Sequence, residues 1–204
     1  MAIHVHRGDL PEGLAFGASI AVDTETLGLN LNRDRLCLVQ ISSGDGNAHL
    51  VQLDRSTYDA PRLKALLADQ KTEKIFHYGR FDLAVLRRWL GVAAMPVYCT
   101  KIASRLTRTY TDRHGLKDIC RELLGVEISK QQQSSDWGAD ELTDAQKEYA
   151  ASDVLYLHRL QAVLSQRLER ENRMPIARAC FAFLPIRAEL DLAGWPDEDI
   201  FSHA

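Results

Sequence analysis

The chain has 204 residues, of which 46% are hydrophobic and 26% are charged, as in one soluble globular domain with at most a short appendage. The formal net charge of −3 argues against a protein that coats long nucleic acid through a basic surface. A small nucleic-acid substrate remains compatible with it, because divalent metals can supply positive charge locally. The 4 cysteines form no CxxC pair, and no secretory or membrane-spanning pattern is evident, so we expect a cytoplasmic protein with no membrane association.

Strand-favouring apolar residues dominate several short segments. The predicted strands are 19–23, 35–42, 48–53, 74–77 and 97–100. The turn sequence Gly44-Asp45-Gly46-Asn47 separates the second from the third, so the first three strands predict an antiparallel start to a sheet. His4 and His6 alternate on a possible additional strand before these.

Helical spacing of apolar residues follows the third strand and dominates after the last one. The predicted helices are 61–67, 80–90, 102–106, 115–124, 144–168 and 176–189. Gly91 is expected to end the second of these helices. Together the elements predict an α/β fold, with a mixed five-stranded sheet flanked by helices.

Asp23-Thr24-Glu25 places two carboxylates at the end of the first predicted strand, at i and i+2 and therefore on the same face. Two acids held this close repel each other, and a hard divalent cation such as Mg²⁺ or Mn²⁺ is the usual reason for such a pair. A solvated strand end is the competing interpretation of this triplet taken alone.

Two further acids, each considered alone, could have a purely structural role. Asp82 lies near the start of a predicted helix, where an acid also caps free N–H groups and favours the helix dipole. Asp153 follows Tyr149 by four residues on an amphipathic helix, so the phenol and the carboxylate lie on one face. A half-buried tyrosine beside a surface acid would give the same spacing.

The order of these motifs along the chain changes the interpretation. D-x-E after the first strand, D after the fourth strand and Y-x-x-x-D on a late helix resemble the DnaQ-like exonucleases, specifically their DEDD branch with tyrosine in the third motif. The sibling branch has a histidine five residues before the last aspartate, and Glu148 occupies that position here. The resemblance implies a ribonuclease-H-like fold and a 3′→5′ exonuclease with Asp23, Glu25, Asp82, Tyr149 and Asp153 as catalytic residues.

Within that branch, HGLKDICRELLGVEISKQQQSSDW and LTDAQKEYAASDVLYL resemble ribonuclease D and its short relative, the oligoribonuclease nano-RNase C. Bacterial ribonuclease D has helical nucleic-acid-binding domains after its nuclease domain. Only 51 residues follow Asp153 in the chain of 204, which favours nano-RNase C. We therefore expect residues 1–170 to form the exonuclease domain and residues 171–204 a C-terminal helix and arm for packing or oligomerisation.

The resemblance implies two divalent ions, Mg²⁺ or Mn²⁺, with Asp23, Glu25, Asp82 and Asp153 as ligands. It implies degradation of RNA as short as dinucleotides to nucleoside 5′-monophosphates, and a homo-oligomer, a ring-shaped octamer. Tyr149 would orient the attacking water, since a phenol with a pKa near 10 is a poor base at neutral pH. The alternatives are a broader ribonuclease D-like exonuclease that trims tRNA or DNA 3′ ends, and a catalytically inactive nucleic-acid-binding module.

Several residues close to the carboxylates in the sequence are expected to contact the substrate. Leu29 lies at the spacing from Asp23 at which histidine-branch oligoribonucleases carry a leucine wedge between bases, and Leu27 or Leu31 could take that part instead. His77 is the expected contact to a sugar or phosphate, and Thr24 lies between the two acids. Core packing remains the alternative for the leucines.

Further along the chain, Trp137 and the loop 131–133 could border the site, with the indole stacking on a base. Lys101, Arg105 and Arg108 recur on one helix face as candidate phosphate contacts, and a solvated helix surface is the alternative.

Overall fold

The computed structural model describes residues 2–129, 131–132 and 134–203. The strands and helices follow in this order: β1 (Ile3–Arg7), β2 (Ser19–Thr26), β3 (Leu36–Ser42), β4 (Ala48–Gln52), α1 (Pro61–Ala68), β5 (Glu73–Phe76), α2 (Arg80–Val85), the π-helical turn η1 (Leu86–Leu90), β6 (Val97–Cys99), α3 (Thr100–Thr107), α4 (Leu116–Leu124), α5 (Asp144–Leu155), α6 (Leu157–Arg170) and α7 (Met174–Leu192).

The strands form one mixed sheet in the order β1-β4-β3-β2-β5-β6. β2, β3 and β4 pair antiparallel, as expected from the turn at 44–47, whereas β1, β5 and β6 each pair parallel to their neighbour. The predicted mixed α/β sheet is confirmed, but the predicted strand count of five is one too low. The additional strand is β1, which carries His4 and His6 and pairs with β4 at one edge of the sheet.

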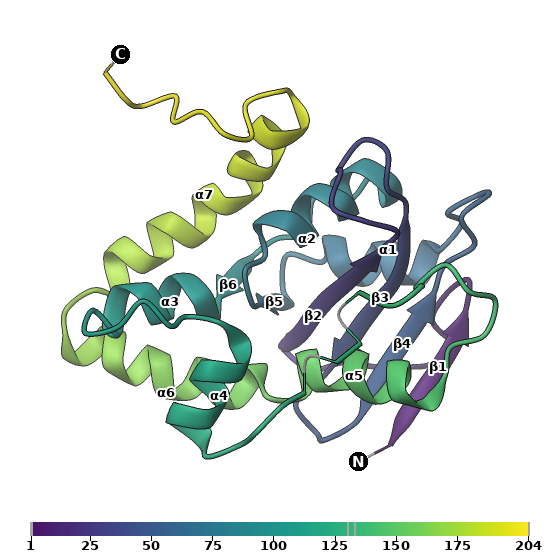
Figure 1. The fold of residues 1–204 in the computed structure, drawn as a ribbon, viewed down its shortest axis with the longest axis horizontal. Coiled ribbons are helices and arrows are strands. Elements are labelled where there is room, and N and C mark those ends of the chain that lie inside the picture. Colours follow the sequence, from purple (N-terminus) through teal and green to yellow (C-terminus); the bar gives the residue numbers. More distant parts are fainter. Residues whose placement is uncertain (1, 130, 133, 204) are drawn as a thin grey trace.

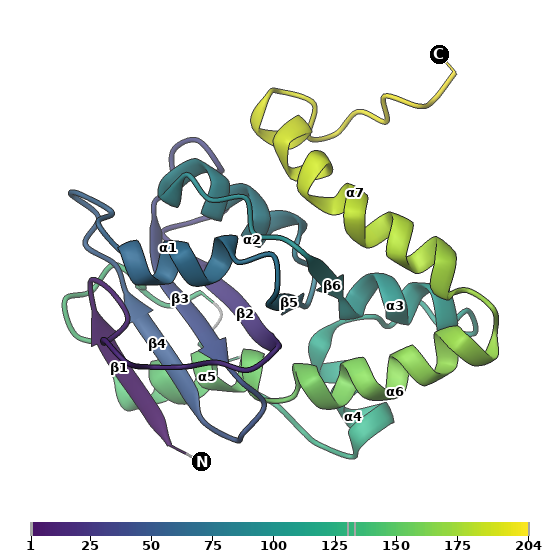
Figure 2. The ribbon, with the colours of Figure 1, turned by 180° about the vertical axis from the view of Figure 1, so that it is seen from behind.

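Helices cover both faces of the sheet (Figures 1 and 2). α5 lies on one face, against β2, β3 and β4, while α1 and α2 lie on the other. Because both faces are covered, β3 (LCLVQIS) is buried along its whole length, which explains its nearly continuous apolar sequence. Gln40 and Ser42 are the two polar residues of this strand, and both are fully buried.

Beyond β6, helices α3, α4, α6 and α7 pack together, and the chain after α7 extends away from the body (Figure 1). The predicted helix 144–168 is two helices, because the backbone turns at Tyr156 (φ −104°, ψ −6°) between α5 and α6. Gly91 ends η1 in the left-handed region at φ 70°, as its sequence position predicts.

None of the helices in the described part of the chain combines the length and apolarity needed to cross a bilayer.

Candidate active site

A cavity of about 760 Å³, which we call the catalytic cleft, lies where β2 extends past its partner β5. β5 pairs only with residues 19–21 of β2, so Asp23 and Glu25 project from a part of β2 that has β3 on one side alone. α2 begins shortly after β5 ends and brings Asp82 to the same place, as expected at the carboxyl ends of neighbouring parallel strands.

Three carboxylates converge in this cleft. One oxygen from each of Asp23, Glu25 and Asp153 lies within 4.8 Å of the others, although Asp153 comes from α5 on the face of the sheet. The alternation of side chains along β2 directs Asp23 and Glu25 to the same side. Oxygen ligands at this spacing suit a hard divalent cation, so the donor set fits the ions implied by the resemblance.

Asp82 lies beside these three carboxylates rather than among them. It is 5% exposed, and its Oδ1 accepts a 2.6 Å hydrogen bond from Thr24 Oγ1, which points to the opposite side of β2 from Asp23 and Glu25. Thr24 therefore joins β2 to α2 and holds Asp82, a role that the sequence alone did not suggest.

Burial and mutual repulsion make these carboxylates hard to ionise. Desolvation, followed by the charges of Asp82, Asp153 and Glu25, raises the pKa of Asp23 well above its usual range. Desolvation, followed by the charges of Asp153 and Asp82, raises the pKa of Glu25 to about 9, and burial raises the pKa of Asp82 to about 7. A divalent cation bound among these oxygens would relieve this repulsion.

Tyr149 lies one helical turn before Asp153 and lines the same cleft. Burial raises the pKa of its hydroxyl, and the charges of Asp153, Glu25 and Asp23 raise it further. The phenol is therefore a hydrogen-bond donor and acceptor at neutral pH and does not act as a base. Trp137 packs against it, with ring centroids 6.0 Å apart.

Gln40 is a contact that the sequence analysis missed. It lies opposite Asp23 in the β2–β3 register, and its Nε2 donates to Asp23 Oδ2 at 3.3 Å. Its Oε1 is buried and has no partner among the described residues. An amide in the middle of a largely apolar, buried strand was the available signal, because a buried amide needs a polar partner.

The predicted substrate contacts divide into two groups. Leu27, Leu29 and His77 line the catalytic cleft, and the two leucines are 49% and 84% exposed, so neither belongs to the core. The Nδ1 of His77 lies 2.9 Å from Thr100 Oγ1, which fixes the ring at the end of β5. Trp137 also lines the cleft, but at 2% exposure it forms the wall and does not project into the space.

Arg105 and Arg108 are not among the described residues that line the cleft. Arg108 is 1% exposed and forms an ion pair with Glu122, and its Nη1 donates to Ser104 Oγ at 3.0 Å. This corrects the expectation of a phosphate contact at Arg108, because its guanidinium is occupied inside the helical half of the molecule. Helical spacing placed it on one face with Lys101 but could not indicate what covers that face.

Residues between the predicted motifs complete the cleft. Lys101 and Lys117 line it, and Lys101 Nζ lies 3.9 Å from the ring centre of Tyr78. Tyr78 adopts φ +66°, an uncommon value for a residue other than glycine, and a sequence gives no direct sign of it. Of the predicted loop 131–133, Gln133 lies outside the described residues, and the lining on that side comes from Ser129, Ser134 and Ser135.

Residues 9–169 match the 3'-5' exonuclease family. The structure of Brucella melitensis NrnC with bound Mg²⁺ is 61% identical, with a TM-score of 0.95 over 100% of both chains. The structure of the same protein bound to pGG is 62% identical, with a TM-score of 0.96 over 100% of both chains. Ribonuclease D of Gluconacetobacter diazotrophicus is 32% identical over 155 residues, 76% of this chain and 39% of that protein.

The chain thus spans about two fifths of the length of the ribonuclease D proteins that it matches. The predicted resemblance and the ribonuclease-H-like fold class are confirmed, since the matched region contains every carboxylate of the cleft. This chain belongs to the 3'-5' exonuclease family and is a homologue of ribonuclease D and NrnC.

Proposed function

We propose that the protein is a 3′→5′ exoribonuclease that degrades short RNA oligonucleotides, including dinucleotides, to nucleoside 5′-monophosphates. The observation that carries this proposal is the convergence of Asp23, Glu25 and Asp153 in one cleft, with Asp82 and Tyr149 beside them. The full-length similarity to NrnC, one structure of which is bound to the dinucleotide pGG, supports the short substrate.

The four carboxylates would hold two divalent ions, Mg²⁺ or Mn²⁺. Asp23, Glu25 and Asp153 would hold one, and Asp23 with Asp82, through water, the other; the position of Asp82 outside the convergent group supports its indirect role. When bound, the ions lower the pKa of the attacking water and neutralise charge on the scissile phosphate. The similarity to NrnC with bound Mg²⁺ supports magnesium as one usable metal.

The protein side chains would position the reactants around that chemistry. Tyr149 orients the attacking water through its neutral hydroxyl, because its raised pKa keeps the proton in place. Leu27 or Leu29 separates the last two bases, since both leucines are exposed at the cleft. His77 contacts the sugar or phosphate, where a hydrogen bond to a 2′-hydroxyl would favour RNA.

We also propose that the protein is cytoplasmic and assembles as a ring-shaped homo-octamer through the C-terminal segment 171–204, outside the exonuclease domain 1–170. α7 packs against α2 and β6, and the arm after it extends away from the body in both views (Figures 1 and 2). They expose large apolar side chains, namely Ile176, Phe183, Ile186, Trp195, Ile200 and Phe201. Light scattering of the purified chain tests the assembly, and a monomer at micromolar concentration would contradict it.

A broader ribonuclease D-like exonuclease, trimming tRNA or DNA 3′ ends, is the second candidate, favoured by the similarity to ribonuclease D. A time course on 5′-labelled RNAs of two to about twenty nucleotides separates the two. Fast cleavage of the dinucleotide with accumulation of longer strands supports the first candidate. Equal or faster shortening of the longest RNA supports the second.

A further inference from the structure

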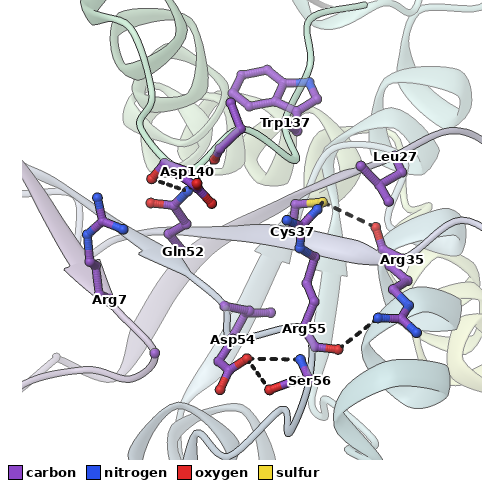
Figure 3. Close-up of a pocket in the computed structure, with 13 residues that line it drawn as sticks. Arg7, Leu27, Arg35, Cys37, Gln52, Asp54, Arg55, Ser56, Trp137 and Asp140 are labelled. Atoms are coloured by element: carbon purple, nitrogen blue, oxygen red, sulfur yellow. Dashed lines mark hydrogen bonds between the residues drawn. The ribbon is translucent and has the colours of Figure 1, made fainter.

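The segment 134–140 separates the catalytic cleft from a second cavity of about 650 Å³, which we call the arginine pocket. Arg7, Arg35 and Arg55 line the arginine pocket (Figure 3). Leu27 and Trp137 line both cavities, so the wall between them is one side chain thick at these residues. A change in the arginine pocket that displaces this wall therefore also changes the shape of the catalytic cleft.

Side chains at the end of β4 and in the loop after it hold the backbone of this segment. Gln52 Nε2 donates to the carbonyl of Ala139 at 2.8 Å and lies 3.2 Å from that of Asp140. Arg55 Nη2 donates to the carbonyl of Gly138 at 2.8 Å. Figure 3 shows Gln52, at the end of β4, and Arg55, from the turn after it, reaching up towards the segment that carries Trp137. Three successive carbonyls are thus fixed to the end of β4 and to the turn that follows it.

The other end of the same segment is fixed to α5. Gln146 Nε2 donates to the carbonyl of Asp136 at 3.0 Å, while its Oε1 accepts from the backbone N–H of Thr143 at 2.9 Å in the capping box that starts α5. Tyr149 follows Gln146 by three residues on this helix. Segment 134–140 therefore bridges the sheet, which carries Asp23 and Glu25, and the helix that carries Tyr149 and Asp153.

Trp137 is the centre of that bridge. It belongs to a small buried cluster with Cys37, Leu38 and Leu50 of the sheet and with Ala150 of α5, so it joins the two elements directly. Since packed interiors transmit small shifts, a displacement of this indole would move Tyr149, against which it packs.

Arg55 fits closely against the backbone that bears Trp137. A Cβ atom on Gly138 would lie 2.5 Å from Arg55 Nη1 and 2.6 Å from Leu27 Cδ2, so both side chains occupy the space that glycine leaves. The guanidinium also places Nη1 3.7 Å from Cys37 Sγ. These contacts leave little freedom for the guanidinium or for the wall above it.

We propose that Arg55 is a positioning residue for the exonuclease reaction, acting from the arginine pocket through Gly138 and Trp137 on the hydroxyl of Tyr149. This inference rests on the proposed function, because Tyr149 is assigned there to the attacking water. Arg55 itself touches neither the carboxylates nor the catalytic cleft among the described residues. Loss of the Arg55–Gly138 bond would shift the wall by a fraction of an ångström, and a shift of 1 Å can lower a rate about 10²-fold.

The test is a double-mutant cycle on dinucleotide hydrolysis with Arg55→Met, which keeps the aliphatic stem, and Trp137→Phe. We expect Arg55→Met to lower kcat about tenfold with KM changed less than about twofold. In the Trp137→Phe background the same substitution is expected to cost less than about twofold, because the element through which Arg55 acts is already altered. Gln52→Met, which removes the neighbouring contact, is expected to act in the same direction.

Arg7→Met is the matched control, since Arg7 lines the same pocket, is 66% exposed and has its ion-pair partner 4.0 Å away. It is expected to leave kcat unchanged. An unchanged kcat in Arg55→Met would overturn the proposal. So would a loss of kcat in the double variant equal to the product of the losses in the two single variants. If the unmutated protein releases no monophosphate, the proposed function fails instead. Acrylamide quenching of Trp137 fluorescence, measured in a Trp89→Phe, Trp195→Phe background, then decides this inference. Arg55→Met must increase the quenching, and unchanged quenching overturns the proposal.

Discussion

Gln40 and Asp23 face each other across the β2–β3 pair, with Gln40 Nε2 3.3 Å from Asp23 Oδ2. The amide is fully buried, so it has no water to exchange for this contact. By donating to one carboxylate oxygen it limits the rotation of Asp23 and leaves the other oxygen for the cleft. A residue that does not bind the metal itself but hydrogen-bonds to a metal ligand is expected to orient that ligand in this way.

Gln40→Leu is therefore expected to weaken Mn²⁺ binding about 10- to 100-fold, because Asp23 loses its orienting donor. Isothermal titration of metal into the purified variant measures this directly. Gln161→Leu is the matched control, since Gln161 also donates to a carboxylate, that of Glu73, away from the cleft. Equal metal affinity in Gln40→Leu and the unmutated protein would contradict this role.

Tyr149→Phe is expected to lower kcat about 10²-fold while metal affinity stays within about twofold, because the hydroxyl orients water and is not proposed as a ligand. Single-turnover hydrolysis of a dinucleotide and a parallel metal titration give the two values. A variant with full activity would remove the phenol from the reaction. A variant that no longer binds metal would instead make Tyr149 a support of the carboxylates.

Asp153→Asn is expected to stabilise the metal-free protein while abolishing the stabilisation by added Mg²⁺, because one member of a mutually repelling group is neutralised. The pH dependence of the metal-free protein's stability has a definite sign. The pKa of Glu25 rises from 4.5 to about 9 on folding, so the folded state holds protons that the unfolded chain releases. Metal-free stability therefore falls as pH rises across that window, and it falls less in Asp153→Asn.

Thermal unfolding in EDTA at pH 6 and pH 8.5 measures both effects. Asp144→Asn serves as the control, since Asp144 begins the same helix with its side chain 94% exposed. A lower midpoint for Asp153→Asn than for the unmutated protein in EDTA would show that the carboxylates do not repel each other as described.

Arg108→Met is expected to destabilise the fold by about 2 kcal/mol, through its lost bonds to Glu122 and Ser104, with KM for a short RNA nearly unchanged. Urea unfolding and steady-state kinetics separate the two quantities. Lys101→Met, at the cleft, is the comparison and should raise KM. If Arg108→Met raised KM and kept its stability, the arginine would contact the substrate as its helical spacing first suggested.

The carboxylates and Tyr149 could be predicted because their chemistry depends on residue types at fixed spacings along single elements. Their convergence was predicted only through family resemblance, since β2, α2 and α5 meet by tertiary packing. Gln40 was missed for the opposite reason: its partner lies on another strand, and its own strand looks like core. Arg108 shows the limit of helical periodicity, which identifies a face but not the element that covers it.

Contacts between elements that are distant in the sequence account for the remaining differences between prediction and structure. The interruption at Tyr156 falls within a continuous helical pattern, and the packing of α5 on the sheet and of α6 on the helical half requires the change of direction. β1 is a short edge strand with alternating histidines, and its pairing with β4 depends on a partner more than 40 positions away. Thr24 was expected at the substrate; it lines the cleft, and its hydroxyl donates to Asp82, a contact between distant elements that its position in the sequence did not indicate.

The most direct measurement follows a 5′-labelled five-nucleotide RNA and a dinucleotide with Mg²⁺, with Mn²⁺ and in EDTA, for the unmutated protein and for Asp23→Asn. Metal-dependent shortening from the 3′ end, one nucleotide at a time, to a labelled nucleoside 5′-monophosphate is the predicted result, with neither activity nor tight metal binding in Asp23→Asn. Release of nucleotides in EDTA, or an Asp23→Asn protein that cleaves at the unmutated rate, would contradict the account.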